Sequence, residues 1–279
     1  MQPFRVALVQ LDAGPEVEVN LARALALVER ALAAGPDLVA LPETFLYRGR
    51  AAGFSAAASE IPGPLTEPFA ALARRQACWL LLGSLAERSA DPERPFITSV
   101  LLAPDGAVAA TYRKVHLFDV DVADGPSAHE SARATPGDRA VVAELGRPEG
   151  DPVRLGLSVC YDLRFPELYR SLALAGAEVL AVPADFTERT GRDHWEVLLR
   201  ARAIENGAWV IAPAQCGSGG GAATPAFGRS MVVDPWGVVV AQAPDGPGVL
   251  VADLDLDRVP AVRRQVPSLA NRRPEAYRP

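Results

Sequence analysis

Cysteine is scarce in this chain, and its scarcity limits both the fold and the compartment. The 279 residues include three cysteines, Cys78, Cys160 and Cys216. Three scattered thiols make no disulfide framework, and an odd number leaves at least one thiol unpaired. A chain in which 49% of the residues are hydrophobic can build a core without such cross-links. We therefore expect a cytoplasmic protein that folds in a reducing environment.

Long apolar runs, basic clusters and paired histidines are also missing. No hydrophobic stretch approaches the roughly 20 residues of a membrane span, and the first residues lack the pattern of a signal peptide. The net charge of −6 disfavours a nucleic-acid surface, which needs clustered Lys and Arg. The histidines, His116, His129 and His194, form no pair at metal-ligand spacing, and no G-x-G-x-x-G opens a predicted helix. We expect a small-molecule partner, no membrane or nucleic-acid partner, and no metal or other cofactor.

Short β-branched runs alternate with amphipathic helical stretches along the chain, which predicts an α/β fold. Strands are predicted at residues 4–11, 37–41, 78–85, 97–103, 107–115, 153–159, 179–184, 208–214, 230–234, 238–243 and 249–256. Helices are predicted at residues 17–35, 65–77, 166–177 and 193–207, with Asp193 as the N-cap of the last.

The remaining segments read as loops and a tail. Residues 119–139 lack periodicity and predict a long surface loop, and residues 217–226 predict a Gly/Ala-rich loop. No linker-like change of composition divides the chain, so we expect a single domain over residues 1–279. Its tail, from about residue 257 to 279, is expected to pack over the domain or over a partner subunit.

Three ionisable side chains directly follow predicted strands, where ligands of open α/β sheets gather. Glu43 follows DLVALP, Lys114 follows VAATYR and Cys160 follows RLGLSV. Taken alone, each has an ordinary explanation: a buried Cys is a small hydrophobe, a Glu after a strand is a loop acid, and a Lys protects an edge strand. The residue types by themselves therefore leave a catalytic role open.

A family resemblance carries the argument further. LPETF at 41–45, YRKVHLFD at 112–119 and CYDLRFPELYR at 160–170 resemble the three signature segments of the nitrilase superfamily of carbon–nitrogen hydrolases. HWEVLLRARAIEN at 194–206 and SMVVDPWG at 230–237 also resemble that family, as does the terminal RRPEAY. The resemblance implies a four-layer α-β-β-α sandwich. It further implies a homodimer, or a multiple of one, formed through helices that flank the site. Residues 166–177 are expected to have an exposed apolar side, which is consistent with such a dimer.

The same resemblance implies a Glu-Lys-Cys catalytic triad. Cys160 would attack the amide carbonyl to form a thioester, and Glu43 would act as the base. Lys114, with the backbone N–H of Tyr161, would stabilise the oxyanion. Glu130 resembles a second glutamate that family members place near the triad, and its ordinary alternative is an exposed loop acid.

The segment after the nucleophile bears on the substrate. The pair Tyr161 and Asp162 resembles amidase branches, and the motifs together are most similar to the deaminated glutathione amidase and omega-amidase group. That resemblance implies an amide of a dicarboxylic 2-oxo acid, whose remote carboxylate needs a cation. The candidates for the cation are Arg164, Arg189 and Arg192, and the alternative for Arg164 is a structural ion-pair residue beside the nucleophile turn.

Further substrate contacts are expected from Phe186, Thr187 and Thr190, which resemble the pocket segment of the family. The chain departs from the branch pattern at Arg229 and Asn271, where His is common. An N-carbamoyl amidohydrolase, another amidase of the superfamily, the glutaminase partner of a synthetase and a non-catalytic metabolite-binding scaffold remain alternatives.

Overall fold

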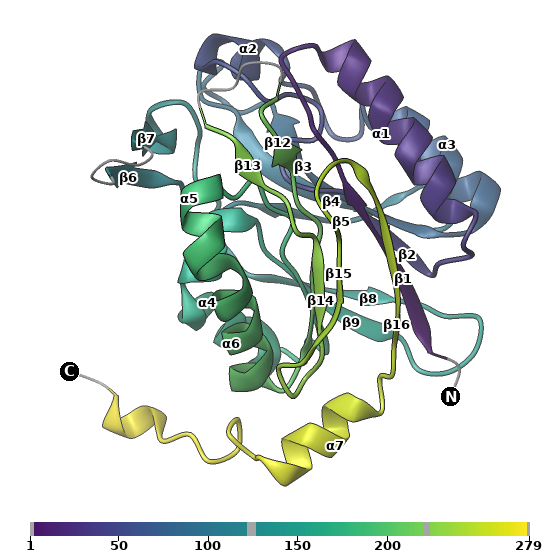
Figure 1. Cartoon of the computed structure of the whole chain (residues 1–279), viewed down its shortest axis with the longest axis vertical. Helices are drawn as coiled ribbons and strands as arrows, with labels where there is room; N and C mark the ends of the chain where they lie inside the picture. Colours follow the sequence, from purple (N-terminus) through teal and green to yellow (C-terminus); the bar gives the residue numbers. More distant parts are fainter. Residues whose placement is uncertain (1–2, 122–126, 220–223, 278–279) are drawn as a thin grey trace.

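Two six-stranded sheets lie face to face, with helices on their outer surfaces (Figure 1). The computed structural model describes residues 3–121, 127–219 and 224–277. The first sheet has the order β16 (Gly248–Leu254), β1 (Phe4–Gln10), β2 (Leu38–Ala40), β3 (Trp79–Glu87), β4 (Phe96–Leu102) and β5 (Val108–Arg113). The second has the order β15 (Val239–Gln242), β14 (Met231–Val233), β11 (Trp209–Ala212), β10 (Val179–Ala181), β9 (Val153–Leu157) and β8 (Val141–Leu145).

The helices complete a four-layer α-β-β-α sandwich, as predicted. Helices α1 (Val17–Leu32) and α3 (Glu67–Gln76) pack on the first sheet. Helices α4 (Pro166–Leu174) and α6 (Glu196–Asn206) pack on the second. Strands β1, β2 and β3 run parallel, and so do β9, β10 and β11, so the chain after each of these strands leaves the sheet at a common edge.

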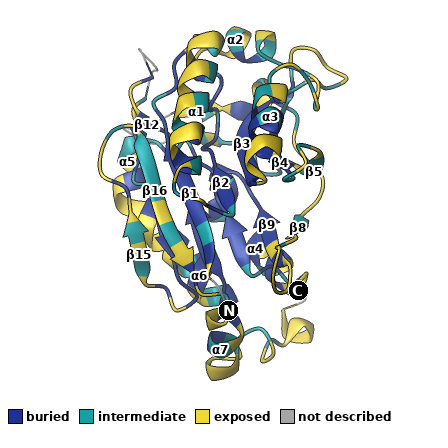
Figure 2. Cartoon of the chain, turned by 90° about the vertical axis from the view of Figure 1, so that its right-hand side faces the viewer, coloured by how far each residue is buried: buried dark blue, intermediate teal, exposed yellow. Residues whose placement is uncertain are grey.

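Alternation along the strands separates two hydrophobic cores. Val6 and Leu8 of β1 face the space between the sheets, whereas Ala7 and Val9 pack in the core shared with α1 and α3. A strand that is buried on both faces needs a continuous apolar sequence, and β1 reads FRVALVQ. Figure 2 shows the buried strands between outer helices whose outward sides are exposed.

The prediction of one long loop at residues 119–139 is wrong. Strand β6 (Asp119–Asp121) pairs antiparallel with β7 (Ser127–His129), and a 3-10 turn follows at Glu130–Ala132. The two strands read DVD and SAH, so they are too short and too polar to show an apolar alternation. The chain also forms β8 and a short helix, α2 (Ala51–Ala56), neither of which was predicted.

The prediction of Asp193 as an N-cap is also wrong. The helical segment begins earlier, with α5 (Glu188–Thr190), and a π-helical turn at Gly191–Trp195 leads directly into α6. The wider turn breaks the regular spacing of apolar residues, which hid the helix start from the sequence. In the predicted loop at 217–226, β12 (Cys216–Gly217) pairs with β13 (Ala226–Phe227), and residues 220–223 of that loop lie outside the described residues.

The tail begins with α7 (Arg258–Gln265), which packs on the domain through buried Val259 and Val262. Arg263 of this helix donates hydrogen bonds to the carbonyl oxygens of residues 177, 206 and 207. After α7 the chain runs along one end of the molecule to a 3-10 turn at Pro274–Ala276 (Figure 1). Within the described ranges, every helix is too short or too polar to span a membrane.

The predicted exposed apolar side of residues 166–177 is mostly absent. Leu168, Tyr169 and Leu172 of α4 are buried in the domain's own core, and Leu174 is the large apolar side chain of this helix that stays exposed. The apolar residues of this helix therefore mostly pack against the helix's own sheet.

Candidate active site

Glu43 lies in the turn that follows β2. Its backbone carbonyl accepts a hydrogen bond from Gln215 Nε2 at 2.9 Å, and the next N–H, of Thr44, donates to Ser84 Oγ at 3.1 Å. Thr44 has a left-handed backbone with φ of 55°. A Cβ at Gly83 would lie 2.0 Å from the carbonyl oxygen of Leu41, so this turn can approach β3 only because residue 83 is glycine. The backbone of the turn is thus held from both sheets.

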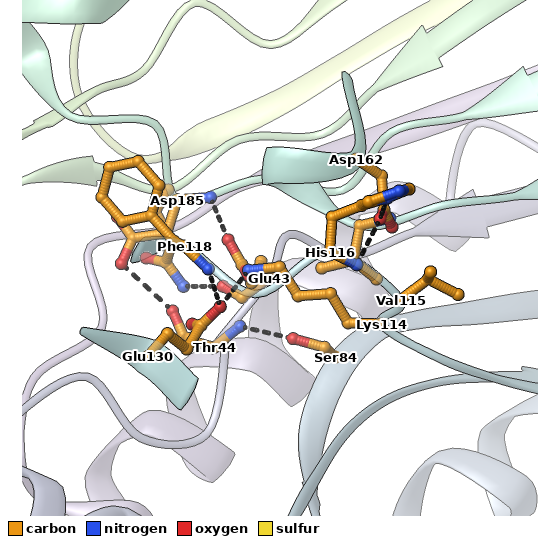
Figure 3. Close-up of polar contacts among 12 residues, drawn as sticks. Glu43, Thr44, Ser84, Lys114, Val115, His116, Phe118, Glu130, Asp162 and Asp185 are labelled. Atoms are coloured by element: carbon orange, nitrogen blue, oxygen red, sulfur yellow. Dashed lines mark hydrogen bonds and ion pairs between the residues drawn. The ribbon is translucent and has the colours of Figure 1, made fainter. Parts of the chain in front are cut away.

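Lys114 leaves the end of β5 and is almost completely buried. Its Nζ lies 2.8 Å from Glu43 Oε1 and 2.8 Å from Glu130 Oε2 (Figure 3). A buried ammonium is tolerated only where carboxylates and hydrogen bonds compensate the loss of water, and two carboxylates do so here. The side chain therefore has one fixed position between the two acids.

Glu130 begins the 3-10 turn after β7 and is 6% exposed, so the alternative of an exposed loop acid is wrong. Its Oε2 also accepts a hydrogen bond from the backbone N–H of Phe118 at 2.8 Å. The β6–β7 hairpin brings Glu130 back beside the strand end that carries Lys114, since Asp119 pairs with His129.

Cys160 opens a 3-10 turn, Cys160–Arg164, just beyond β9. Its φ of 47° is unusual for a residue with a side chain, and its N–H donates to the carbonyl of Pro183 at 2.9 Å. Such strained positions persist where the surrounding structure holds them, and they concentrate at functional sites. The chain therefore changes direction sharply at Cys160, the residue that carries the thiol.

Asp162 joins the cysteine turn to the lysine segment. Its Oδ2 accepts hydrogen bonds from Val159 N–H at 2.8 Å and from the Tyr112 hydroxyl at 2.7 Å. Its Oδ1 accepts the His116 N–H at 3.1 Å and lies 2.7 Å from His116 Nδ1 (Figure 3). The side chain is fully buried, and the His116 ring stacks on Phe165 at 3.6 Å. One carboxylate therefore fixes residues on both sides of Lys114 and the residue before Cys160.

Electrostatics set the resting protonation of the three central groups. Burial raises the pKa of the Cys160 thiol well above its ordinary value, and the charge of Glu43 raises it further against the opposing effect of Lys114. Burial also raises the pKa of Glu43, with Lys114 opposing. Burial lowers the pKa of Lys114, but Glu130 and Glu43 outweigh it, and the pKa ends well above its ordinary value. At neutral pH the site holds a neutral thiol and a permanent ammonium.

Asp185 and Arg48 support the same site, and neither was predicted. The backbone N–H of Asp185 donates to Glu43 Oε2 at 2.8 Å, so both carboxylate oxygens of Glu43 are held. The Asp185 carboxylate pairs with Arg48 Nε at 2.9 Å, and Arg48 is 7% exposed. The position of Asp185 just after β10 was a signal that could have revealed it, because the three predicted residues also follow strands.

A cavity of about 170 Å³ opens beside the thiol. All nine predicted site residues line it: Glu43, Lys114, Glu130, Cys160, Tyr161, Arg164, Phe186, Thr187 and Thr190. Unpredicted lining residues are Thr44, Phe118, Ala128, Arg133 and Asp185. Of the three arginines proposed to hold a carboxylate, Arg164 lines the cavity, whereas Arg189 and Arg192 do not. Arg192 pairs instead with Glu188.

The ionisable side chains of this cavity suit acid–base and nucleophilic chemistry rather than metal binding. Lys114 occupies the space between Glu43 and Glu130 that a cation would need, so an ammonium already lies between the two carboxylates. Across residues 3–121, 127–219 and 224–277, the structure assembles no group of three or more His, Cys, Asp or Glu side chains that could hold a metal ion.

A family model and individual relatives of known name agree on the family of this chain. The carbon–nitrogen hydrolase family model matches residues 5–264. The deaminated glutathione amidase of Homo sapiens is 42% identical over 98% of this chain and 83% of its own length. The deaminated glutathione amidase of Synechocystis sp. is 41% identical over 98% of this chain and 99% of its own. The omega-amidase NIT2 of Mus musculus is 36% identical over 99% of this chain and 98% of its own length.

Solved structures show the same likeness. The C. elegans NitFhit protein superposes with a TM-score of 0.90 at 36% identity, over 100% of this chain and 67% of that one. A Glu-to-Gln mutant of the amidase from Nesterenkonia sp. AN1 superposes with a TM-score of 0.80 at 31% identity, over 98% of each chain, and its structure shows acrylamide added to the active-site cysteine. A full-length match in sequence and in fold leaves one assignment: this chain belongs to the carbon–nitrogen hydrolase family, as a hydrolase of non-peptide carbon–nitrogen bonds.

Proposed function

We propose that this hydrolase cleaves a small carboxylate-bearing amide through a thioester on Cys160. The observation that carries the proposal is the fixed position of Lys114, 2.8 Å from both Glu43 and Glu130 and on the wall of the same cavity as the thiol. A nucleophile, a base and a permanent cation at one buried cavity are the groups that acyl transfer requires.

The first half-reaction forms the thioester. Cys160 Sγ attacks the amide carbon while Glu43 accepts the thiol proton, so the high pKa of the thiol is overcome during the attack. The carbonyl oxygen becomes an oxyanion that Lys114 and the Tyr161 N–H stabilise, an effect for which single donors contribute roughly 10²–10³ in rate. Glu43 then gives its proton to the leaving nitrogen, the carbon–nitrogen bond breaks, and ammonia or an amine departs.

The second half-reaction releases the acid. A water molecule replaces the leaving group, and Glu43 takes one of its protons as the oxygen attacks the thioester carbon. The carbon–sulfur bond breaks, and the proton returns from Glu43 to the Cys160 sulfur. Because its carboxylate is held by Lys114 and by the Asp185 N–H, Glu43 keeps one orientation through both half-reactions. Glu130 holds Lys114 from the other side.

The proposed substrates are deaminated glutathione and the omega-amides of 2-oxo acids. Relatives at 41% and 36% identity are named for these two activities. Such substrates carry a carboxylate remote from the scissile amide. Arg164 supports this choice, because it lies on the cavity wall in the same turn as Cys160 and a guanidinium matches a carboxylate well.

A substrate panel tests the proposal. The panel contains 2-oxoglutaramate, deaminated glutathione, an N-carbamoyl amino acid, a simple aliphatic amide and a nitrile, with Cys160→Ala as the blank. Ammonia is measured for the simple amides, and the released amine for deaminated glutathione. Turnover of the 2-oxo acid amides that is lost in Cys160→Ala is expected. Preference for the carbamoyl compound or the nitrile would contradict the substrate assignment, and turnover of a 2-oxo acid amide by Cys160→Ala would contradict the mechanism.

We also propose a cytoplasmic homodimer. Cys78, Cys160 and Cys216 are free thiols in the structure, which suits a reducing compartment. Neighbouring helices α4 and α6 expose Leu174 and Val197, the latter 65% exposed, which favours a partner surface on this side. Light scattering at micromolar concentration is expected to give at least twice the monomer mass, and a monomeric mass would contradict the dimer.

A further inference from the structure

Arg133 and Arg164 are cations on the cavity wall that no carboxylate of the described residues meets at hydrogen-bonding distance. The Nη2 atom of Arg133 lies 3.8 Å from Glu130 Oε1, too far for a hydrogen bond. The Nη1 atom of Arg164 lies 3.2 Å from His194 Nδ1, which is no acid. Each guanidinium therefore keeps N–H donors for an anionic ligand.

The other charged groups of the cavity already have partners. Glu43 and Glu130 share Lys114, with both oxygen-to-nitrogen distances at 2.8 Å. Asp185 also lines the cavity, and it pairs with Arg48 from behind the wall. Four cations, Lys114, Arg48, Arg133 and Arg164, face three acids, Glu43, Glu130 and Asp185, which leaves one positive charge that an anionic ligand would balance.

The two arginines belong to different walls. Arg164 lies in the turn that carries Cys160, and its guanidinium carbon is 5.1 Å from the ring centre of Phe186 and 6.0 Å from that of Tyr161. Arg133 follows the turn that begins with Glu130, and its guanidinium carbon is 5.5 Å from the ring centre of Phe54. They share none of these neighbours and come from separate segments of the chain.

Resting on the proposed function, we propose that Arg133 determines specificity by binding a second substrate carboxylate, on the leaving-group side of the scissile amide. In this assignment Arg164, which shares a turn with Cys160, holds the acyl part, which stays attached to the sulfur. Arg133, which comes from the separate hairpin segment, is assigned to the part that leaves. The substrate class is therefore an amide with a carboxylate on each side of the scissile bond, which deaminated glutathione has and a simple omega-amide lacks.

The inference predicts a ratio of rates. Deaminated glutathione is compared with its C-terminal carboxamide, which differs only in lacking the glycine carboxylate. A hydrogen-bonded Arg–carboxylate pair contributes about a tenfold to hundredfold preference. Wild-type kcat/KM is expected to favour the free carboxylate by that factor, and Arg133→Gln is expected to lower the ratio at least about tenfold, chiefly through KM. Arg133→Lys, which keeps the charge but loses the planar fork, is expected to give an intermediate ratio.

The controls separate this inference from general damage. Arg139→Gln changes an exposed arginine of the same segment, paired with Asp138 and absent from the cavity wall, and should keep the wild-type ratio. A ratio in Arg133→Gln within twofold of wild type would overturn the inference, and so would a ratio that collapses only in Arg164→Gln. Wild-type turnover of 2-oxoglutaramate tests the proposed function separately: if it is present while the two glutathione compounds react equally, only the role of Arg133 fails. If Arg133→Gln does not fold, the ratio in Arg133→Lys decides.

Discussion

Asp162→Asn is the most informative single change, because it keeps the size of a buried side chain and removes its charge. Asp162 accepts hydrogen bonds from two backbone N–H groups, those of Val159 and His116, and from the Tyr112 hydroxyl. Burial and the neighbouring charge of Asp162 raise the pKa of Tyr112, so the phenol remains a donor. An asparagine has one carbonyl oxygen and an NH₂ group, and the NH₂ would face a backbone donor in either orientation.

The loss can be estimated from these contacts. Leaving one buried backbone donor unpaired costs about 1–3 kcal/mol, and hydrogen bonds to a charged acceptor contribute more than neutral ones. We expect a loss of roughly 2–4 kcal/mol in the free energy of unfolding, which lowers Tm by roughly 5–10 °C in a chain of this size. We also expect kcat to fall about 100-fold, because Asp162 sets the positions of both the Cys160 turn and the Lys114 segment, and small displacements of reacting groups cost that much.

A matched control exists in Asp234→Asn. Asp234 is also buried, and it accepts the N–H groups of Trp236 and Val238 at 2.9 Å and pairs with Arg258. Neither Asp234 nor Arg258 lines the cavity. Both variants are assayed well below their melting temperatures, with Tm from differential scanning calorimetry. The reasoning is refuted if Asp162→Asn keeps kcat within threefold of wild type, or if Asp234→Asn loses as much kcat for a similar loss of Tm.

The site offers three further tests. The pKa of Glu43 is raised above its ordinary value of 4.5 and its ionised form is the base, so kcat/KM should fall as the pH drops through a value above 4.5; a limb below 4.5 in the pH–rate profile would contradict this. Lys114→Met leaves Glu43 and Glu130 buried without their cation, and should remove activity and about 3–5 kcal/mol of stability, measured by urea unfolding; unchanged stability would refute the buried ion pairs. Gly83→Ala places a methyl group 2.0 Å from the Leu41 carbonyl oxygen and should displace Glu43, lowering kcat more than KM rises, whereas wild-type kcat would show that the turn can move freely.

The layer order and the central residues could be predicted because the relevant signals are local. Glu43, Lys114 and Cys160 each follow an apolar run and stand in recognisable segments, and the four-layer arrangement follows from the same resemblance. The N-terminal strand β1 shows such a local signal. Its sequence is continuously apolar because both faces of the strand are buried.

The position of Arg133 on the cavity wall and the role of Asp162 could not be predicted. Both depend on contacts between segments that are distant in the sequence. Arg133 reaches the cavity only because β6 and β7 form a hairpin, and these strands have no apolar alternation. Asp162 was assigned only to a motif that distinguishes family branches, whereas its partners include Tyr112, 50 residues away. The resting state of the Cys160 thiol was equally hidden, because its raised pKa results from burial and from the charge of Glu43.

The two sheets contribute different halves of the reacting machinery. Glu43 and Lys114 follow strands of the first sheet, whereas Cys160 and Asp185 follow strands of the second. A chain in which each sheet has formed separately would hold the sulfur without its base or its cation. Reactivity therefore arises only at the step that packs the sheets together. In refolding experiments we therefore expect catalytic activity to return only when the two sheets have packed together.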